Sequence, residues 1–356
     1  MSSEIEPEKP RSSSRKPIWV WVTGIIFLAL FITGYSYYKK IYGANILADT
    51  PQKQYLYIPD GSDLIELVKN LQTHELLRST ADFEWAANFL HFKTGIKPGK
   101  YRLTDGMSNK QLIRKIQLGK QEPVDIILHS LRLKENLAAY VGKKIEADSM
   151  AIYTLLADRH YTDSLGYTTD NIYTMILPNT YRFKWNTSAK EFLTRMNRES
   201  ARFWSTDKIE KARAIGLDKT QVIILASIVN QESNRVDEMP TIAGVYLNRL
   251  HRGVKLDADP TVIFANNDFS IKRVTRKYLI KDSPYNTYKY KGLPPGPITM
   301  PSLQAIEAVL NYQKSDYMFF CAKDDFSGHH AFAITREEHL INAHKFQKAL
   351  DARNIH

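Results

Sequence analysis

The feature that most constrains this chain is an uncharged apolar stretch near its start. Residues 18–38 read IWVWVTGIIFLALFITGYSYY, which is about the length that a helix needs to cross a bilayer. Aromatic residues flank the stretch, as they do where a helix meets the two membrane surfaces: Trp19, Trp21, Tyr35, Tyr37 and Tyr38. A cleaved signal peptide is the alternative, but the stretch is long for one and no small-x-small cleavage site follows it. We therefore predict a retained transmembrane helix.

Basic residues are unevenly placed around this predicted helix. Four precede it, whereas only Lys39 and Lys40 follow it closely; the four are Lys9, Arg11, Arg15 and Lys16. Positive charge next to a transmembrane helix favours the cytoplasmic side. We expect residues 1–17 to form a cytoplasmic tail and everything after Lys40 to lie outside, in a protein that crosses the membrane once.

Length and composition limit how many domains the rest of the chain can form and which partners it can bind. With 356 residues, 43% of them hydrophobic, it has room for two folded domains besides the anchor. A formal net charge of +11 suits an acidic partner. The Lys and Arg residues are spread along the chain and no base-stacking motif accompanies them, so we expect no nucleic-acid partner. Cys321 is the single cysteine, which excludes a disulfide framework and a Cys-rich metal site.

The region after the anchor predicts an α+β fold in several parts. After a linker at residues 39–54, residues 55–120 read as a small α+β domain. Ser62 is expected to cap a helix that buries Leu64, Leu67, Val68 and Leu71. A second helix is predicted at residues 81–92 and a turn into a strand at 95–103. Ser108 and Gln111 form the pattern of a capping box that opens a third helix.

Residues 121–211 are interpreted as a connector packed between two domains. The stretch VDIIL at residues 124–128 predicts a strand, and helices are expected at 133–144 and 150–158. The last domain would then cover residues 212–356.

Glu232 stands out in that last domain. The run QVIILASIV predicts a buried helix, and residues three, four and seven positions before Glu232 are Val229, Ile228 and Leu225. This spacing places the carboxylate at the edge of a buried stripe. Apolar surroundings and the negative end of a helix both raise a carboxyl pKa, as a general acid requires. A surface glutamate beside a core helix remains the alternative.

Other polar residues of this domain have structural explanations. Asp259 precedes Pro260, which favours a helix N-cap over a second catalytic carboxylate. Pro301 is expected to start a helix, and Thr335 with Glu338 predicts the capping box of the last one. His330 could line a cleft or hydrogen-bond within the fold. The stretch YNTYKYKGLPPGPITMP combines three tyrosines and Asn286 with a restricted loop, which suits a sugar chain.

Five blocks now carry a family resemblance: LASIVNQES, IAGVYLNRL, ADPTVIF, SPYNTYKYKGLPPGPITMPS and HHAFA. In this order they resemble the MltG family, the YceG-like endolytic transglycosylases of peptidoglycan, and residues 55–120 resemble that family's LysM-like domain. Relatives commonly carry two glutamates in the first block. Here Asn230 replaces the first, and Glu232 aligns with the catalytic acid. Tyr173, Thr174 and Asn179 also depart from the pattern of relatives.

The resemblance implies a lytic transglycosylase of the periplasm, anchored in the inner membrane. It would cleave the bond from N-acetylmuramic acid to N-acetylglucosamine inside nascent glycan strands, leaving 1,6-anhydro ends and ending strand elongation. Peptidoglycan and its synthases are the implied partners, with no metal or cofactor. Implied substrate contacts are Asn248, Thr261, Tyr285, Asn286, Tyr288 and His330. A muramidase using Asp257 or Asp259 as second carboxylate, and a non-enzymatic glycan-binding scaffold, are the alternatives.

Overall fold

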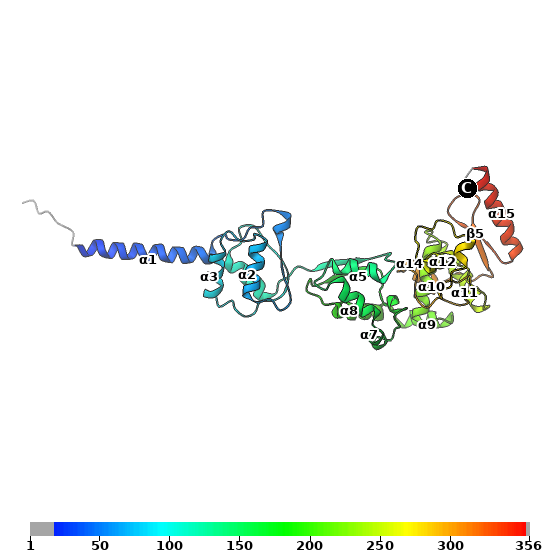
Figure 1. Ribbon diagram of the computed structural model, residues 1–356, viewed down its shortest axis with the longest axis horizontal. Coiled ribbons are helices and arrows are strands. Elements are labelled where there is room, and N and C mark those ends of the chain that lie inside the picture. Colours follow the sequence, from blue (N-terminus) through cyan, green and yellow to red (C-terminus); the bar gives the residue numbers. More distant parts are fainter. Residues whose placement is uncertain (1–17, 354–356) are drawn as a thin grey trace, which may run out of the picture. The chain divides into compact units, whose positions relative to one another are not determined.

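The computed structural model describes residues 18–353 and divides the chain into two compact units, one up to Glu122 and one from Pro123 onward. Both units combine helices with a few short strands (Figure 1). The strands form three antiparallel two-stranded sheets, β1 with β2, β3 with β4 and β5 with β6. The predicted α+β class is confirmed.

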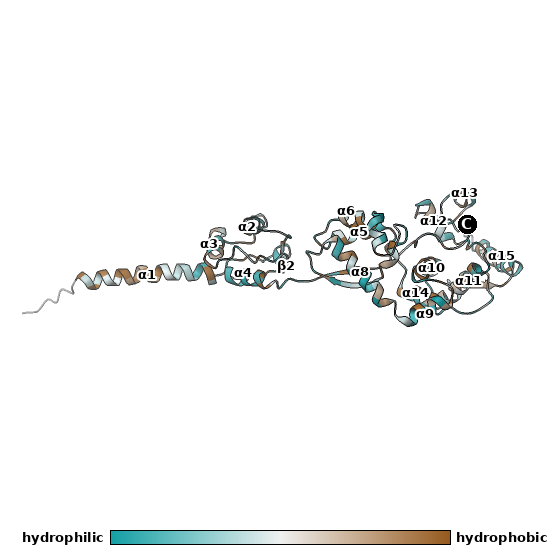
Figure 2. Cartoon of the chain, turned by 90° about the horizontal axis from the view of Figure 1, so that it is seen from below, coloured by the Kyte–Doolittle hydropathy of each residue, from teal (hydrophilic) through white to brown (hydrophobic). Residues whose placement is uncertain are grey.

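The predicted membrane segment is helix α1 (Ile18–Tyr42). Among the described residues, it is the one helix long and apolar enough to cross a membrane, and hydrophobic residues recur along it in Figure 2. The helix extends four residues beyond the predicted span, and its C-terminal part packs on the rest of the first unit. Asn109 Nδ2 donates to the Lys40 carbonyl at 2.9 Å, and Tyr37 stacks on Trp85. The end of the apolar helix is therefore held against the residues that follow it.

The first unit contains η1 (Pro51–Gln54), β1 (Tyr55–Ile58), α2 (Leu64–Thr73), α3 (Thr80–Phe89), β2 (Gly99–Arg102) and α4 (Asn109–Leu118). Leu56 of β1 lies opposite Tyr101 of β2, and both side chains are buried. The expected linker at residues 39–54 is instead part of this unit. Ile46 is completely buried and bridges to Leu77. Burying such an apolar side chain contributes roughly 1.5–3 kcal/mol, which holds the segment in place.

Helix ends in the first unit test the capping predictions. The box of Ser108 and Gln111 at α4 is confirmed, with both reciprocal hydrogen bonds present. The cap of α2 is Asp63, not Ser62, because the Asp63 carboxylate accepts from the Glu66 amide. Helix α3 is shorter than predicted. His91 adopts φ 53° just after it, and the chain turns to bury Phe92.

The first part of the second unit contains β3 (Val124–Leu128), α5 (Lys134–Gly142), α6 (Ser149–Ala157), α7 (Arg159–Ser164), η2 (Ile172–Met175), β4 (Asn179–Phe183), α8 (Ala189–Phe203) and α9 (Thr206–Ala214). The predicted strand 124–128 and the two following helices are confirmed within two residues at each end. Strand β3 pairs with β4, and Ile126 faces Tyr181 across the ladder. This part of the unit has a hydrophobic core of its own, which packs on the β3 and β4 sheet and includes Leu137, Phe192 and Met196.

The remaining elements are α10 (Lys219–Glu232), α11 (Met239–His251), α12 (Asp259–Asn266), α13 (Arg276–Leu279), α14 (Leu303–Leu310), β5 (Phe319–Ala322), β6 (His330–Ala333) and α15 (Arg336–Ala352). Helix α10 is the centre of their core, because every residue from Val222 to Val229 is buried. It packs against α11, α12 and α14. Pro301 does not start α14, since Ser302 caps it and Leu303 is its first residue. The capping box of Thr335 and Glu338 is confirmed at α15.

Candidate active site

Glu232 is the last residue of α10, three positions after Val229, where the buried apolar run of this helix ends. Its side chain keeps partial access to solvent. The Oε1 atom accepts a hydrogen bond from the Tyr246 hydroxyl at 2.5 Å. Burial raises the pKa of Glu232 to about 7, against the pull of this hydrogen bond and with help from the nearby Asp259 charge. The carboxyl group can therefore hold or release a proton near neutral pH.

Tyr246 fixes this carboxyl group in place. It lies on α11 with 1% of its surface exposed, and its ring meets Phe320 edge-to-face with centroids 5.8 Å apart. Burial raises the pKa of the Tyr246 hydroxyl well above its usual value, so the hydroxyl stays a donor. Sequence reasoning missed this residue. The available signal was a tyrosine inside an apolar helix, since a buried hydroxyl needs a partner.

Asp259 is not the helix cap that the sequence predicts. Ala258 occupies the cap position of α12 without a side-chain hydrogen bond, and Asp259 is the first helical residue. Its exposed carboxylate accepts from the Tyr288 hydroxyl at 2.6 Å. Burial and the Asp259 hydrogen bond raise the pKa of Tyr288, with a smaller contribution from the Glu232 charge. The site therefore holds two electrostatically linked carboxylate and tyrosine pairs.

Asp257 is held differently from Asp259. It adopts φ 51°, and its carboxylate forms an ion pair with the largely buried Arg249. Arg249 also donates to the carbonyls of Lys255 at 2.7 Å and Met318 at 2.9 Å. Burial raises the pKa of Asp257, although the arginine opposes this shift. These contacts tie the loop before α12 to α11.

His330 lies at the start of β6 beside the Tyr246 and Phe320 pair. Its ring meets Phe320 edge-to-face at 5.3 Å. The buried Glu238 carboxylate accepts from the His330 amide at 2.7 Å and contacts Nδ1 at 3.1 Å. The imidazole is thus fixed by the residue that opens α11. Sequence reasoning did not identify Glu238, which the structure joins to His330 across 92 positions.

Three predicted substrate contacts have their polar groups occupied by the protein. Asn286 is fully buried and donates to the carbonyls of Leu279 and Lys281 at 2.9 and 2.7 Å. Thr261, also fully buried, bonds the Thr287 hydroxyl at 2.8 Å. Asn248 donates to the carbonyls of Ser315 and Tyr317. In this structure these side chains hold loops around the site, and contact with substrate stays a prediction for all three.

The proline-rich loop lies against the helix that carries Glu232. The Ile298 amide donates to the buried Ser227 hydroxyl at 3.1 Å, and the Ser302 amide donates to Asn230 Oδ1 at 3.0 Å. Asn230 therefore anchors the start of α14. Tyr285 of the same loop packs against Phe264, with ring centroids 4.7 Å apart. Of the six predicted contacts, Thr261 and Asn286 are buried, and the other four keep partial exposure: Asn248, Tyr285, Tyr288 and His330.

The three family departures upstream have structural places of their own. Tyr173 is buried and its hydroxyl donates to the Leu131 carbonyl at 3.1 Å. Thr174 is also buried, and its hydroxyl donates to the Asn171 carbonyl. Asn179 is exposed at the start of β4. The partners Leu131 and Asn171 belong to neither of the pairs around Glu232.

The chemistry available here is proton transfer by one carboxyl group. Glu232 combines a pKa near neutrality with a fixed orientation, and Asp259 supplies a second charge close by. Within residues 18–353, no group of three or more His, Cys, Asp or Glu side chains is placed to hold a metal ion.

Known proteins resemble the chain in sequence and in fold. The sequence model of the YceG-like family matches residues 56–345. The endolytic murein transglycosylase of Streptococcus pneumoniae strain D39 is 28% identical, over 90% of this chain and 64% of that protein. The endolytic murein transglycosylase of Bacillus subtilis is 27% identical, over 87% of this chain and 89% of that protein. The chain thus spans slightly less than two thirds of the pneumococcal relatives.

The solved structures add a likeness in fold. A crystal structure of a YceG-like protein from Listeria monocytogenes superposes with a TM-score of 0.54 at 25% identity. The match covers 81% of this chain and 99% of the Listeria protein. The family match extends over both units and includes Glu232, Tyr246 and Asp259, and on this evidence the chain belongs to the YceG-like family.

Proposed function

We propose that this protein is an endolytic lytic transglycosylase of peptidoglycan, with Glu232 as its single general acid and base. The observation that carries the proposal is the Glu232 carboxyl group, which has a pKa of about 7 and accepts a hydrogen bond from Tyr246. The names of the curated relatives supply the substrate class, since each is called an endolytic murein transglycosylase.

In the proposed reaction, Glu232 first protonates the oxygen that joins N-acetylmuramic acid to N-acetylglucosamine, and the bond from that oxygen to the muramic C1 breaks. The carboxylate then takes the proton of the muramic C6 hydroxyl, whose oxygen bonds to C1. The products are a 1,6-anhydro end and a free N-acetylglucosamine end, and no water is consumed. Tyr246 keeps the carboxyl group oriented through both transfers. Cleavage inside a nascent strand would end its elongation.

A muramidase is the second candidate function. The observation that favours it is the position of the Asp259 carboxylate near Glu232. This exposed carboxylate is close enough to Glu232 to raise the pKa of that group. A hydrolase needs a second carboxylate to activate water or form a covalent intermediate. Asp257 suits that role less, because Arg249 binds its carboxylate.

Product chemistry separates the two candidates. Glycan strands are incubated with the full chain in oxygen-18 water, and the fragments are analysed by mass spectrometry. If the protein is a transglycosylase, the products should have anhydro ends without oxygen-18 at the muramic C1. Quantitative label at C1 would establish hydrolysis instead. A Glu232→Gln variant that cleaves strands at an unchanged rate would show that Glu232 is not the acid. The protein would then be a glycan-binding scaffold, and the cleavage would come from a contaminating enzyme.

The cellular placement is part of the proposal. Helix α1 would cross the inner membrane once, with residues 1–17 in the cytoplasm and the residues after Lys40 in the periplasm, where peptidoglycan synthases work. The support is the apolar helix and the excess of basic residues before it. A periplasm-dependent reporter fused after Ala44 should be active, whereas activity of a cytoplasm-dependent reporter at the same position would reverse the topology.

The first unit is proposed to be a LysM-like domain, residues 55–120, that holds glycan near the catalytic domain at residues 212–356. Residues 121–211 would serve as the connector. The support is the family match across residues 56–345. Removing residues 55–120 should weaken binding to isolated sacculi. Unchanged binding would show that these residues act only as a spacer.

A further inference from the structure

Two neighbouring cavities of the second unit share Arg132 and Phe269 in their linings. The inner cavity, of about 170 Å³, is walled by apolar side chains of α12 and the segments around it, among them Ile263, Phe264 and Ile298. The outer cavity, of about 620 Å³, lies along α5 and is lined by Asn136, Tyr140 and Lys143. We call the two together the Arg132 groove.

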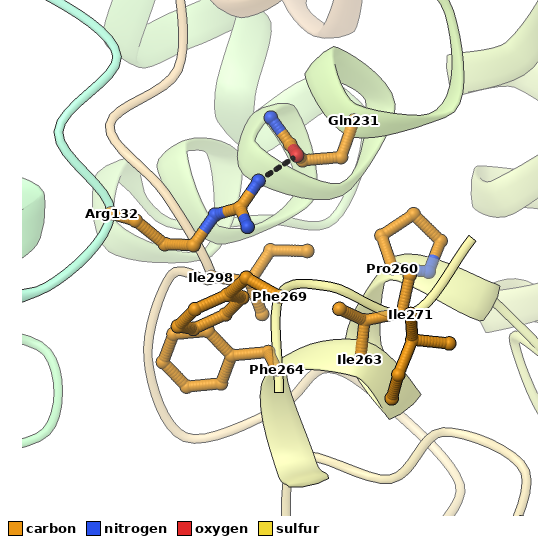
Figure 3. Close-up of a pocket in the computed structure, with 8 residues that line it drawn as sticks. All are labelled: Arg132, Gln231, Pro260, Ile263, Phe264, Phe269, Ile271 and Ile298. Carbon is orange, nitrogen blue, oxygen red and sulfur yellow. Dashed lines mark hydrogen bonds between the residues drawn. The ribbon is translucent and has the colours of Figure 1, made fainter. Parts of the chain in front are cut away.

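Arg132 stands where the two cavities meet. Figure 3 shows its guanidinium group reaching toward Gln231, across from the rings of Phe264 and Phe269. Nη2 donates to Gln231 Oε1 at 2.8 Å, and the guanidinium carbon lies 4.5 Å from the Phe269 centroid. Gln231 is neutral, so it does not compensate the charge. Within the described part of the chain, Nε and Nη1 of Arg132 have no hydrogen-bond partner, which leaves donors for a ligand.

The Arg132 groove has a positive charge balance. Neither cavity lining contains an aspartate or a glutamate. Lys143 is exposed, and its ammonium group forms no ion pair with another described residue. The cavity of the first unit differs, because Asp63 and Glu84 line it together with Lys69 and Lys93. A groove with two cations and no acid attracts a ligand that carries carboxylates.

The position of the groove indicates which carboxylates these are. Gln231, which Arg132 binds, directly precedes Glu232 in α10, so the groove lies beside the proposed acid. The acetylated sugars of a glycan strand are uncharged, and the carboxylates of peptidoglycan lie on the peptide stems of its muramic acid residues. A muramic acid without a stem also has a carboxylate on its lactyl group, but that group is too short to fill both cavities.

We infer that the Arg132 groove binds the peptide stem of the muramic acid residue at the cleavage site, with stem carboxylates on Arg132 and Lys143 and an apolar side chain in the inner cavity. This inference rests on the proposed function, since it makes the enzyme selective for strands that carry stems. The guanidinium group presents planar donors that suit a carboxylate, and the aromatic faces of Tyr140 and Phe269 suit the peptide backbone.

The test compares kcat/KM of the full chain in detergent on three strand preparations. One carries stems, one is stripped of them by an amidase, and one is stripped and then has its lactyl carboxylates amidated. The wild type should prefer strands with stems. Arg132→Gln should lower this preference about tenfold, as expected for a lost charged hydrogen bond. Lys143→Gln should lower it about threefold, as expected for an exposed cation.

Lys190→Gln is the matched control, because Lys190 is an exposed lysine of α8 in the same unit and lines neither cavity. It should keep the wild-type preference. The inference is overturned if the Arg132 and Lys143 variants keep that preference as well. It is also overturned if they lose activity on the stripped strands alone, since the lactyl carboxylate, which is free only there, would then be the ligand. An equal loss on all three preparations overturns it too, because the two residues would then not act on the stem.

Calorimetric binding of a free stem peptide separates the inference from the proposed function. The wild type should bind the peptide. The Arg132→Gln variant should bind it more weakly or not at all, and so should the wild type when the carboxyl groups of the peptide are amidated. If the peptide binds in this way but no strand is cut, the proposed function is wrong and the inference that the groove binds a stem peptide is supported. If strands are cut to anhydro ends but the peptide does not bind, the inference about the groove is wrong and the proposed function is supported.

Discussion

The end of α10 and the start of α12 use the same pair of groups in opposite surroundings. At each, a carboxylate accepts a hydrogen bond from a tyrosine hydroxyl, Glu232 from Tyr246 at 2.5 Å and Asp259 from Tyr288 at 2.6 Å. Tyr246 is buried and Glu232 stands at the negative end of its helix, whereas Asp259 is exposed at a positive end. The surroundings, and not the hydrogen bond, therefore raise the pKa of Glu232 and make it the proposed acid.

The largest expected effect is on catalysis and separates these two carboxylates. Glu232→Gln keeps the shape of the side chain but cannot deliver a proton, so kcat should fall by about a hundredfold or more. Asp259→Asn should retain substantial activity, because a transglycosylase needs one acid. Initial rates of strand cleavage by both variants check this. Equal, complete losses in the two variants would point to a hydrolase with two essential carboxylates.

The second effect is on stability and depends on pH. Burial raises the pKa of Glu232 from 4.5 to about 7, so ionisation costs the folded protein more than the unfolded chain. Below pH 4 the group is protonated in both states and no cost arises. The cost grows as pH rises from 4.5 and is complete above 7, where it reaches up to about 3 kcal/mol.

Replacing Glu232 by glutamine removes this cost. The variant should therefore gain stability relative to the wild type at pH 8 and gain none from this source at pH 4. Urea unfolding at both pH values measures the difference. The same stability difference at both pH values would show that the folded protein does not disfavour the ionised carboxylate.

Local patterns in the sequence predicted much of what surrounds Glu232. The apolar run from Val222 to Val229 indicated a buried helix and placed Glu232 at its edge, as found. The capping boxes that begin at Ser108 and Thr335 were also predictable, because their reciprocal hydrogen bonds span only three residues. Such features depend on neighbours along the chain.

Features that depend on distant partners were not predictable in this way. An aspartate before a proline fits a helix cap and a first helical residue equally well, and the partner of Asp259, Tyr288, lies 29 positions away. Asn286 has the residue type of a sugar contact, but the fold uses its amide to satisfy two backbone carbonyls. Arg132 gave no local signal, because its contact with Gln231 spans 99 positions.

The third effect is a pair of opposite shifts in the pH dependence of the rate. The Tyr246 hydroxyl lowers the pKa of Glu232 and the Asp259 charge raises it. The rate should fall at high pH as Glu232 loses its proton. Tyr246→Phe should move that fall to higher pH, and Asp259→Asn should move it to lower pH. Profiles of kcat/KM against pH test both directions, and two shifts of the same sign would contradict the arrangement.

The smallest effect concerns what Asp259 contributes to folding. A true N-cap such as Ser302, whose hydroxyl accepts from the Ala305 amide, should cost about 1 kcal/mol of stability when replaced by alanine. Asp259→Ala should cost at most about half as much, because Asp259 caps no backbone amide of α12 and the partly exposed Tyr288 hydroxyl can turn to water. Urea midpoints of the two variants at neutral pH give the comparison. A larger loss for Asp259→Ala than for Ser302→Ala would show that the bond to Tyr288 holds the start of α12 in place, and the contrast with Glu232 would then be between a structural and a chemical carboxylate.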